Sequence, residues 1–157
     1  MDNLKKHQVF FHDLKFILKY CTHFRLYLAL CNDDSFIQES HNIILNEYND
    51  RVLWLSFPYD NRFLFSFLEN TIDSSKVTIV NGLKDNINID TVLATMNVVR
   101  ETFYQFNLPI ILWVDDSIMA RFVKIAPDFY NCSGSITLKW GHMEKTFIYE
   151  PEEFNFS

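Results

Sequence analysis

Residues 24–35 read Phe-Arg-Leu-Tyr-Leu-Ala-Leu-Cys-Asn-Asp-Asp-Ser, and this stretch decides how the chain is organised. Its apolar part, residues 24–31, is too short for a good helix and is typical of a central strand that is buried on both faces. The polar residues 32–35 end this strand and can cap a helix over about residues 36–48. The stretch therefore predicts a buried strand that is followed at once by a helix.

The same alternation continues along the rest of the chain. Further helices are predicted over residues 3–20, 62–70, 117–126 and from 88 or 90 to about 106, and further strands over residues 52–57, 76–80, 109–114 and 135–140. Strands that alternate with helices imply right-handed crossovers. We therefore expect an α/β fold, a three-layer open sheet of about five mostly parallel strands with helices on both faces. The predicted core residues of its strands are Leu28, Leu30, Val52, Leu53, Ile79, Ile111 and Leu112.

The composition predicts one domain over residues 1–140. The chain has 157 residues, of which 48% are hydrophobic, enough for a substantial core. From residue 141 onward the sequence becomes acidic and aromatic. Residues 141–157 are interpreted either as a natural C-terminal tail that adds an edge strand or as an appended segment, because Gly141-His142-Met143 looks like a cloning junction.

Charge, hydropathy and cysteine content indicate which classes of partner and which cellular compartment to expect. The net charge is −6, whereas a nucleic-acid binder usually carries a basic stripe, so no nucleic-acid partner is expected. No apolar run approaches the ~20 residues of a membrane span, so no membrane partner is expected. An odd count of three cysteines, without a C-x-x-C motif or a signal peptide, favours reduced thiols and a cytoplasmic location.

The glycine content argues against an ordinary nucleotide site. The three glycines lie at positions 82, 134 and 141, and neither G-x-G-x-x-G nor the P-loop G-x-x-x-x-G-K-[ST] can be written with them. The histidines and cysteines form no recognised zinc motif, and no G-x-S-x-G elbow is present. We therefore predict no catalytic residue, no resident metal and no cofactor.

Two pairs of carboxylates are the strongest candidates for chemistry. Asp33 and Asp34 follow one predicted strand, and Asp115 and Asp116 follow another. In common doubly wound sheets these two strands are neighbours, and ligands bind outside the carboxyl ends of strands, so the four groups could share an acidic rim that suits Mg²⁺. The simpler interpretation is helix capping by Asp34-Ser35 and Asp116-Ser117, which contributes about 1 kcal/mol for each cap.

Two later stretches are distinctive. Residues 111–116 read Ile-Leu-Trp-Val-Asp-Asp, and residues 125–130 read Ile-Ala-Pro-Asp-Phe-Tyr. Together they resemble a domain found at the front of bacterial and cyanobacterial signalling proteins of the STAND type, often ahead of tetratricopeptide repeats. Residues 26–33 and 77–83 resemble the first and third strands of that domain, so the likeness covers about residues 8–140. The positions of the motif are Trp113, Ala126, Pro127, Asp128, Phe129, Tyr130, Ser133 and Gly134.

This resemblance implies a P-loop-NTPase-like α/β domain that has lost its Walker A loop. The third strand ends in Asn81-Gly82 where an acidic residue of a Walker B motif would stand, and Tyr130 replaces the tryptophan of the family motif. The arginine that usually precedes the Ser-Gly pair is missing. The motif residues are therefore expected to be structural, and we expect no hydrolysis of nucleotides.

The resulting prediction is a non-catalytic NTPase-like domain in a bacterial signalling or defence assembly, with another protein or a second copy as its partner. The candidate interaction residues are aromatic: Phe57, Tyr59, Phe63, Phe65 and Phe67. The last three alternate within a short predicted helix and cannot all face one core stripe, unless the helix is buried nearly all round. The alternative function is a small nucleotide- or Mg²⁺-binding enzyme that uses the acidic rim.

Overall fold

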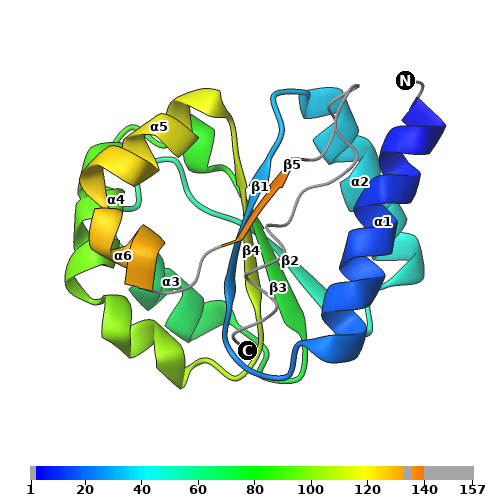
Figure 1. The fold of residues 1–157 in the computed structure, drawn as a ribbon, viewed down its shortest axis with the longest axis horizontal. Helices are drawn as coiled ribbons and strands as arrows, with labels where there is room; N and C mark the ends of the chain where they lie inside the picture. Colours follow the sequence, from blue (N-terminus) through cyan, green and yellow to red (C-terminus); the bar gives the residue numbers. More distant parts are fainter. Residues whose placement is uncertain (1–2, 133–135, 140–157) are drawn as a thin grey trace.

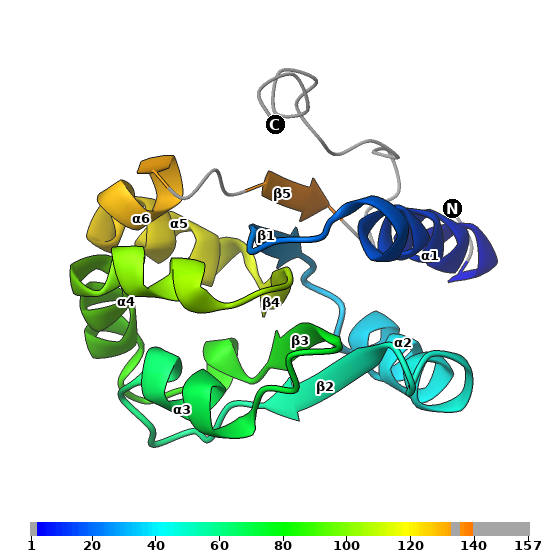
Figure 2. The same cartoon turned by 90° about the horizontal axis from the view of Figure 1, so that it is seen from below.

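The computed structural model describes the backbone of residues 3–132 and 136–139 and the side chains of residues 7–131. Its centre is a parallel sheet built from β1 (Leu26–Leu30), β2 (Val52–Ser56), β3 (Val77–Asn81), β4 (Ile110–Val114) and the short β5 (Ile136–Lys139). The strand order is β2-β3-β4-β1-β5, which Figure 2 shows as a stack. The first four strands carry the described side chains, and β5 pairs with β1 at the edge through its backbone.

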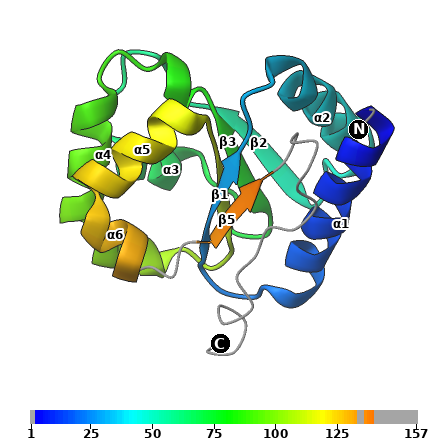
Figure 3. The same ribbon diagram turned by 45° about the horizontal axis from the view of Figure 1, so that its top comes forward.

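Helices cover both faces of this sheet. One face carries α1 (Asn3–Tyr20) and α2 (Asp34–Glu47). The other face carries α3 (Leu64–Thr71), α4 (Ile89–Val98), α5 (Asp116–Ile125) and α6 (Pro127–Cys132), together with the 3₁₀ turns η1 (Leu83–Asp85) and η2 (Arg100–Gln105) (Figures 1 and 3). The predicted α/β class, with parallel strands between two helical layers, is confirmed.

Strand alternation divides the interior into two cores. Along β1, Leu26, Leu28 and Leu30 point to the α3–α6 layer, and Tyr27 and Ala29 point to the α1–α2 layer. Since successive side chains of a strand face opposite sides, each central strand contributes to both cores. This double burial explains why β1 and β4 are apolar along their whole length.

The prediction of core residues is confirmed for all strand positions except Leu53. Leu53 is half-buried, as are its neighbours Trp54 and Leu55. The physical reason is that β2 lies at an edge of the sheet and pairs with β3 alone among the described strands, so its residues are less completely covered.

Two helical segments differ from expectation. The helix predicted to reach about residue 106 ends at Val98, and η2 follows it. In a 3₁₀ turn, residues three apart lie on one side, and this places Phe103 and Phe106 together in the core. Helix α6 was not predicted either: Pro127 opens it, because proline has the backbone φ of a helix and needs no N–H in the first turn.

Within the described part of the chain, every helix is either too short or too polar to cross a membrane.

Candidate functional site

The carboxyl ends of β1 and β4 form the centre of the candidate site. The two strands are direct neighbours, with Leu30 opposite Val114, so the carboxylate pairs that follow them do share one rim of the sheet. A further backbone bond, from the Cys31 N–H to the Val114 carbonyl at 2.9 Å, holds the two strand ends together. The sequence prediction that the four aspartates meet at one edge agrees with this arrangement.

Two of the four carboxylates cap helices. Asp33 Oδ1 accepts the backbone N–H of Phe36 at 3.2 Å and caps α2. Asp115 Oδ1 accepts the backbone N–H of Ile118 at 2.8 Å and caps α5. Each cap satisfies a backbone donor that has no partner within its helix. Capping is therefore confirmed, but the predicted cap positions are wrong by one residue: Asp33 and Asp115 cap the helices, and Asp34 and Asp116 are the first helical residues.

The third carboxylate is held by a lysine from another loop. Lys84 Nζ lies 2.6 Å from Asp34 Oδ1 and 2.7 Å from its Oδ2, which ties η1 to the start of α2. The hydrogen bond to Asp34, with a smaller contribution from the charges of Asp34, Asp85 and Asp115, raises the pKa of Lys84 against the opposing effect of burial.

The fourth carboxylate belongs to a reciprocal bridge. Asn32 Nδ2 donates to Asp116 Oδ2 at 3.0 Å, and the backbone N–H of Asp116 donates to Asn32 Oδ1 at the same distance. One amide side chain thus links the loop after β1 to the first residue of α5. These two residues are 84 positions apart in the sequence.

These contacts decide what the rim can bind. Each of the four carboxylates has a protein donor, and the described residues contain no group of three or more potential metal ligands. The connection between β1 and α2 is only residues 31–33, and Asn32 and Asp33 are already engaged in it. A phosphate-binding P-loop needs a longer glycine-containing turn whose N–H groups face the ligand.

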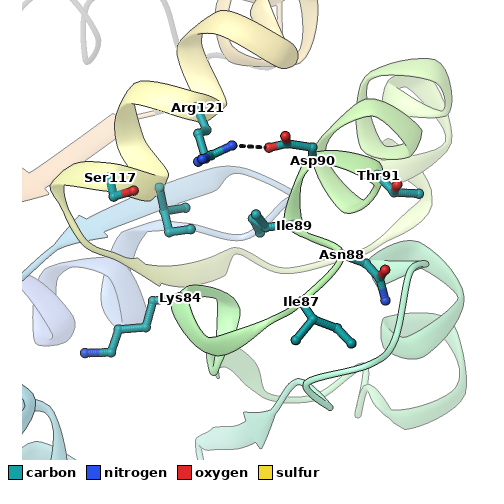
Figure 4. A pocket seen from close by; sticks show the side chains of 9 residues that line it. Lys84, Ile87, Asn88, Ile89, Asp90, Thr91, Ser117 and Arg121 are labelled. Atoms are coloured by element: carbon teal, nitrogen blue, oxygen red, sulfur yellow. Dashed lines mark hydrogen bonds and ion pairs between the residues drawn. The ribbon is translucent and has the colours of Figure 1, made fainter.

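A hollow of about 450 Å³ lies beside this rim, between the starts of α4 and α5 and the η1 turn. Figure 4 shows Arg121 facing Asp90 across it, and the two form an ion pair of 2.6 Å. Its other cation, Lys84, is the lysine that holds Asp34. Both cations that line this hollow are therefore paired with carboxylates.

The residues of the resemblance motif lie mostly in the core. Trp113, Ala126 and Phe129 are buried, and Tyr130 packs partly buried against the α3–α6 core. The backbone N–H of Phe129 donates to Asn97 Oδ1 at 2.8 Å, so a side chain of α4 holds the first turn of α6. Pro127 and Asp128 are exposed. Ser133 and Gly134 lie outside the described residues, as does the segment 141–157.

The candidate interaction aromatics separate into three groups. Phe57 is buried in the α3–α6 core, so its prediction as a surface residue is wrong: it follows directly after β2 and packs edge-on against Phe67. Phe65 and Phe67 are half-buried against the same core, because α3 is covered over much of its surface. Tyr59 and Phe63 are 63% and 52% exposed.

Phe63 also borders an apolar hollow of about 240 Å³ between α3 and α4. The opposite wall is formed by residues at the end of α4 and just beyond it: Met96, Val98 and Val99. Val98 is 79% exposed, so an apolar surface is open to solvent at this place.

Sequence reasoning missed the residues that hold the rim and the first turn of α6. Lys84, Asn32 and Asn97 act through partners that are distant in the sequence, and no local pattern marks them. Asn32 stands between the apolar run 24–31 and the predicted helix over residues 36–48. An asparagine in this position indicates a turn, and it does not indicate the contact with Asp116.

No protein-family model matches the chain, and no curated protein matches its sequence. The resemblance to the domain of STAND-type signalling proteins therefore stays a prediction.

Proposed function

We propose that this chain is a non-catalytic, P-loop-NTPase-like protein-interaction domain of a bacterial signalling or defence assembly. The observation that carries the proposal is the short connection between β1 and α2, residues 31–33, whose side chains are bound to the protein itself. In a P-loop NTPase this loop surrounds the phosphates with backbone N–H groups. It also supplies a lysine for the phosphates and a hydroxyl for Mg²⁺.

The arrangement after the inner strands is a second support. β1 is an inner strand of a parallel sheet and is followed after three residues by helix α2. If the resemblance holds, the connection after β1 corresponds to the Walker A loop of a P-loop NTPase. The β3 strand ends at Asn81 and Gly82, at the place of the acidic residue. Both features support a P-loop-NTPase-like domain that lacks the groups for hydrolysis.

The surface supports an interaction role. Tyr59, Phe63 and Val98 are all more than half exposed, and the last two border the hollow between α3 and α4. Exposed apolar groups gathered around a hollow are typical of surfaces that bind protein. We take this hollow as the contact surface for a protein partner or a second copy.

Nucleotide binding is tested by thermal melting with Mg²⁺-ATP and Mg²⁺-GTP. A ligand at 100 times its Kd stabilises a folded protein by about 2.7 kcal/mol, which is several degrees at this size. We expect no shift and no release of phosphate. A shift that disappears in Asp33→Ala or Asp115→Ala would instead support the alternative, a nucleotide- or Mg²⁺-binding enzyme that uses the acidic rim.

The interaction surface is tested by cross-linking and affinity capture with Phe63→Ser. The matched control is Leu45→Ser on α2, since Leu45 is 50% exposed and lies on the opposite helical layer. We expect Phe63→Ser to reduce the amount of captured partner or of self-associated protein, and Leu45→Ser to leave it unchanged. Equal effects of both substitutions contradict the assignment of this surface.

A further inference from the structure

A second hollow lies on the opposite helical layer, between α1 and α2. Its volume is about 410 Å³, and His7, Phe11, His12, Lys15 and Tyr48 are among the residues that line it. Phe11 and Tyr48 stack at 5.4 Å with nearly parallel rings, so an aromatic pair joins the two helices here. His12 and Lys15 are exposed beside this pair. The hollow therefore combines an aromatic pair with two histidines, Lys15 and the carboxylate of Glu47.

We infer that the acidic, aromatic C-terminal segment of this same chain, residues 140–157, binds in the hollow between α1 and α2.

Charge supports this occupant. The sequence of α1 contains four lysines and one aspartate, in a chain whose net charge is −6. Residues 140–157 contain four glutamates and one lysine. The α1 helix is thus the most basic segment of an acidic protein, and the C-terminal segment carries the opposite charge. Glu47 is the single acidic residue of the lining, on the α2 side of the hollow.

Side-chain chemistry supports it as well. The segment carries Phe147, Tyr149, Phe154 and Phe156 among its glutamates, which suits a hollow lined by an aromatic pair with an exposed lysine beside it. Burial, and then the charge of Glu47, raise the pKa of Tyr48 against a weaker effect of Arg51. A phenol hydroxyl carries its proton at neutral pH and can donate a hydrogen bond to a carboxylate.

The place where the described chain ends supports the same occupant. Lys139 is the last residue of β5 and pairs with Leu30 at the carboxyl end of β1. Helix α1 precedes β1 and lies level with β1 and β5, as Figure 2 shows, and its first half is at this same end of the sheet. Extended chain covers roughly 3.3 Å per residue, so residues 140–157 can pass over a helix about 10–12 Å across.

The test uses the full chain and measures how fast chymotrypsin cleaves after Tyr149 and Phe154 under native conditions, by mass spectrometry. The first variant is Lys15→Glu, at an exposed position of the hollow. The matched control is Lys124→Glu, at an exposed position in the last turn of α5 on the other layer. The compensating variant adds Glu150→Lys, Glu152→Lys and Glu153→Lys to Lys15→Glu.

We expect Lys15→Glu to speed the cleavage about three- to tenfold, as reversal of an exposed ion pair implies. Lys124→Glu should have no effect, and the compensating variant should return the rate to within about twofold of the original. Equal rates for Lys15→Glu and Lys124→Glu overturn the proposal, and so does a failure of compensation. If Lys15→Glu lowers the melting temperature strongly, His12→Glu replaces it.

Dilution distinguishes binding of the segment within one chain from binding to a second copy. Binding within one chain predicts a cleavage rate that does not change with protein concentration. Protection that disappears on dilution means that another copy supplies the segment, which overturns the proposal as stated.

Discussion

Gly82 is the single described residue whose backbone conformation depends on being glycine. Its φ is +104°, and a Cβ at this position would lie 2.7 Å from the carbonyl oxygen of Phe57. Gly82→Ala therefore combines an unfavourable φ with a backbone clash, and we expect a loss of about 1–3 kcal/mol in the free energy of unfolding, measured with urea. The control is Asn81→Ala at the end of β3. A loss for Gly82→Ala no larger than that of the control contradicts the prediction.

The ion pair between Lys84 and Asp34 gives a prediction about pH. The Lys84 side chain is partly exposed, so the pair is expected to contribute only about 0.2–1 kcal/mol. Because folding raises the pKa of Lys84 above its ordinary value of 10.5, this stabilisation is complete below that pH. It is lost as the pH rises through the raised pKa, where the ammonium loses its proton.

The measurement for Lys84 is the difference in unfolding free energy between the original protein and Lys84→Gln. We expect a constant difference from neutral pH to about 9 and a decline toward zero well above 10.5. Lys124→Gln serves as the control for general effects of alkali. A difference that grows with pH would contradict the assigned contact.

At the scale of single elements, β4 and β2 differ in how much they stabilise the fold. Leu112 lies in the middle of β4, between β3 and β1, and is fully buried, whereas Leu53 on the edge strand β2 is half-buried. Leu112→Ala should cost about 2–5 kcal/mol through lost burial and the cavity left behind. Leu53→Ala should cost clearly less in the same urea titration. Equal losses would show that the edge strand is covered by something outside the described residues.

Helix α6 is held by a neighbouring helix in addition to the proline at its start. Asn97 of α4 accepts the backbone N–H of Phe129, while its Nδ2 lies 3.5 Å from Asp128 Oδ2, a long and weak contact. We therefore expect Asn97→Ala to cost about 0.5–1.5 kcal/mol, and Asp128→Asn to leave the melting temperature nearly unchanged. If Asp128→Asn destabilised as much as Asn97→Ala, the carboxylate would have a structural role.

For the whole molecule, sequence predicts what depends on local alternation and misses what depends on distant partners. The strands β1 and β4 and the start of α2 follow from apolar runs and polar stops, which are local signals. Helix α6 depends on Asn97, and the state of the acidic rim depends on Lys84 and Asn32. These contacts exist only after β1, β3 and β4 have come together, so no pattern within one segment contains them.

The two cores are joined by shared strands, and this arrangement predicts unfolding as one unit. Trp54 and Trp113 both report on the α1–α2 core, whereas Leu93 is fully buried in the α3–α6 core on the other side of the sheet. Because neighbouring residues of β1, β3 and β4 pack into opposite cores, loss of one helical layer exposes strands that the other layer needs.

Leu93→Ala tests this coupling in a Trp140→Phe background, which leaves two tryptophans as the fluorescent reporters. We expect a loss of about 2–5 kcal/mol, with midpoints of urea unfolding that coincide for tryptophan fluorescence and far-ultraviolet circular dichroism. Ile44→Ala in the α1–α2 core should shift both signals in the same way. If Leu93→Ala shifted circular dichroism but left the fluorescence midpoint in place, the layers would unfold separately. That result would mean that the shared strands do not couple the unfolding of the two cores.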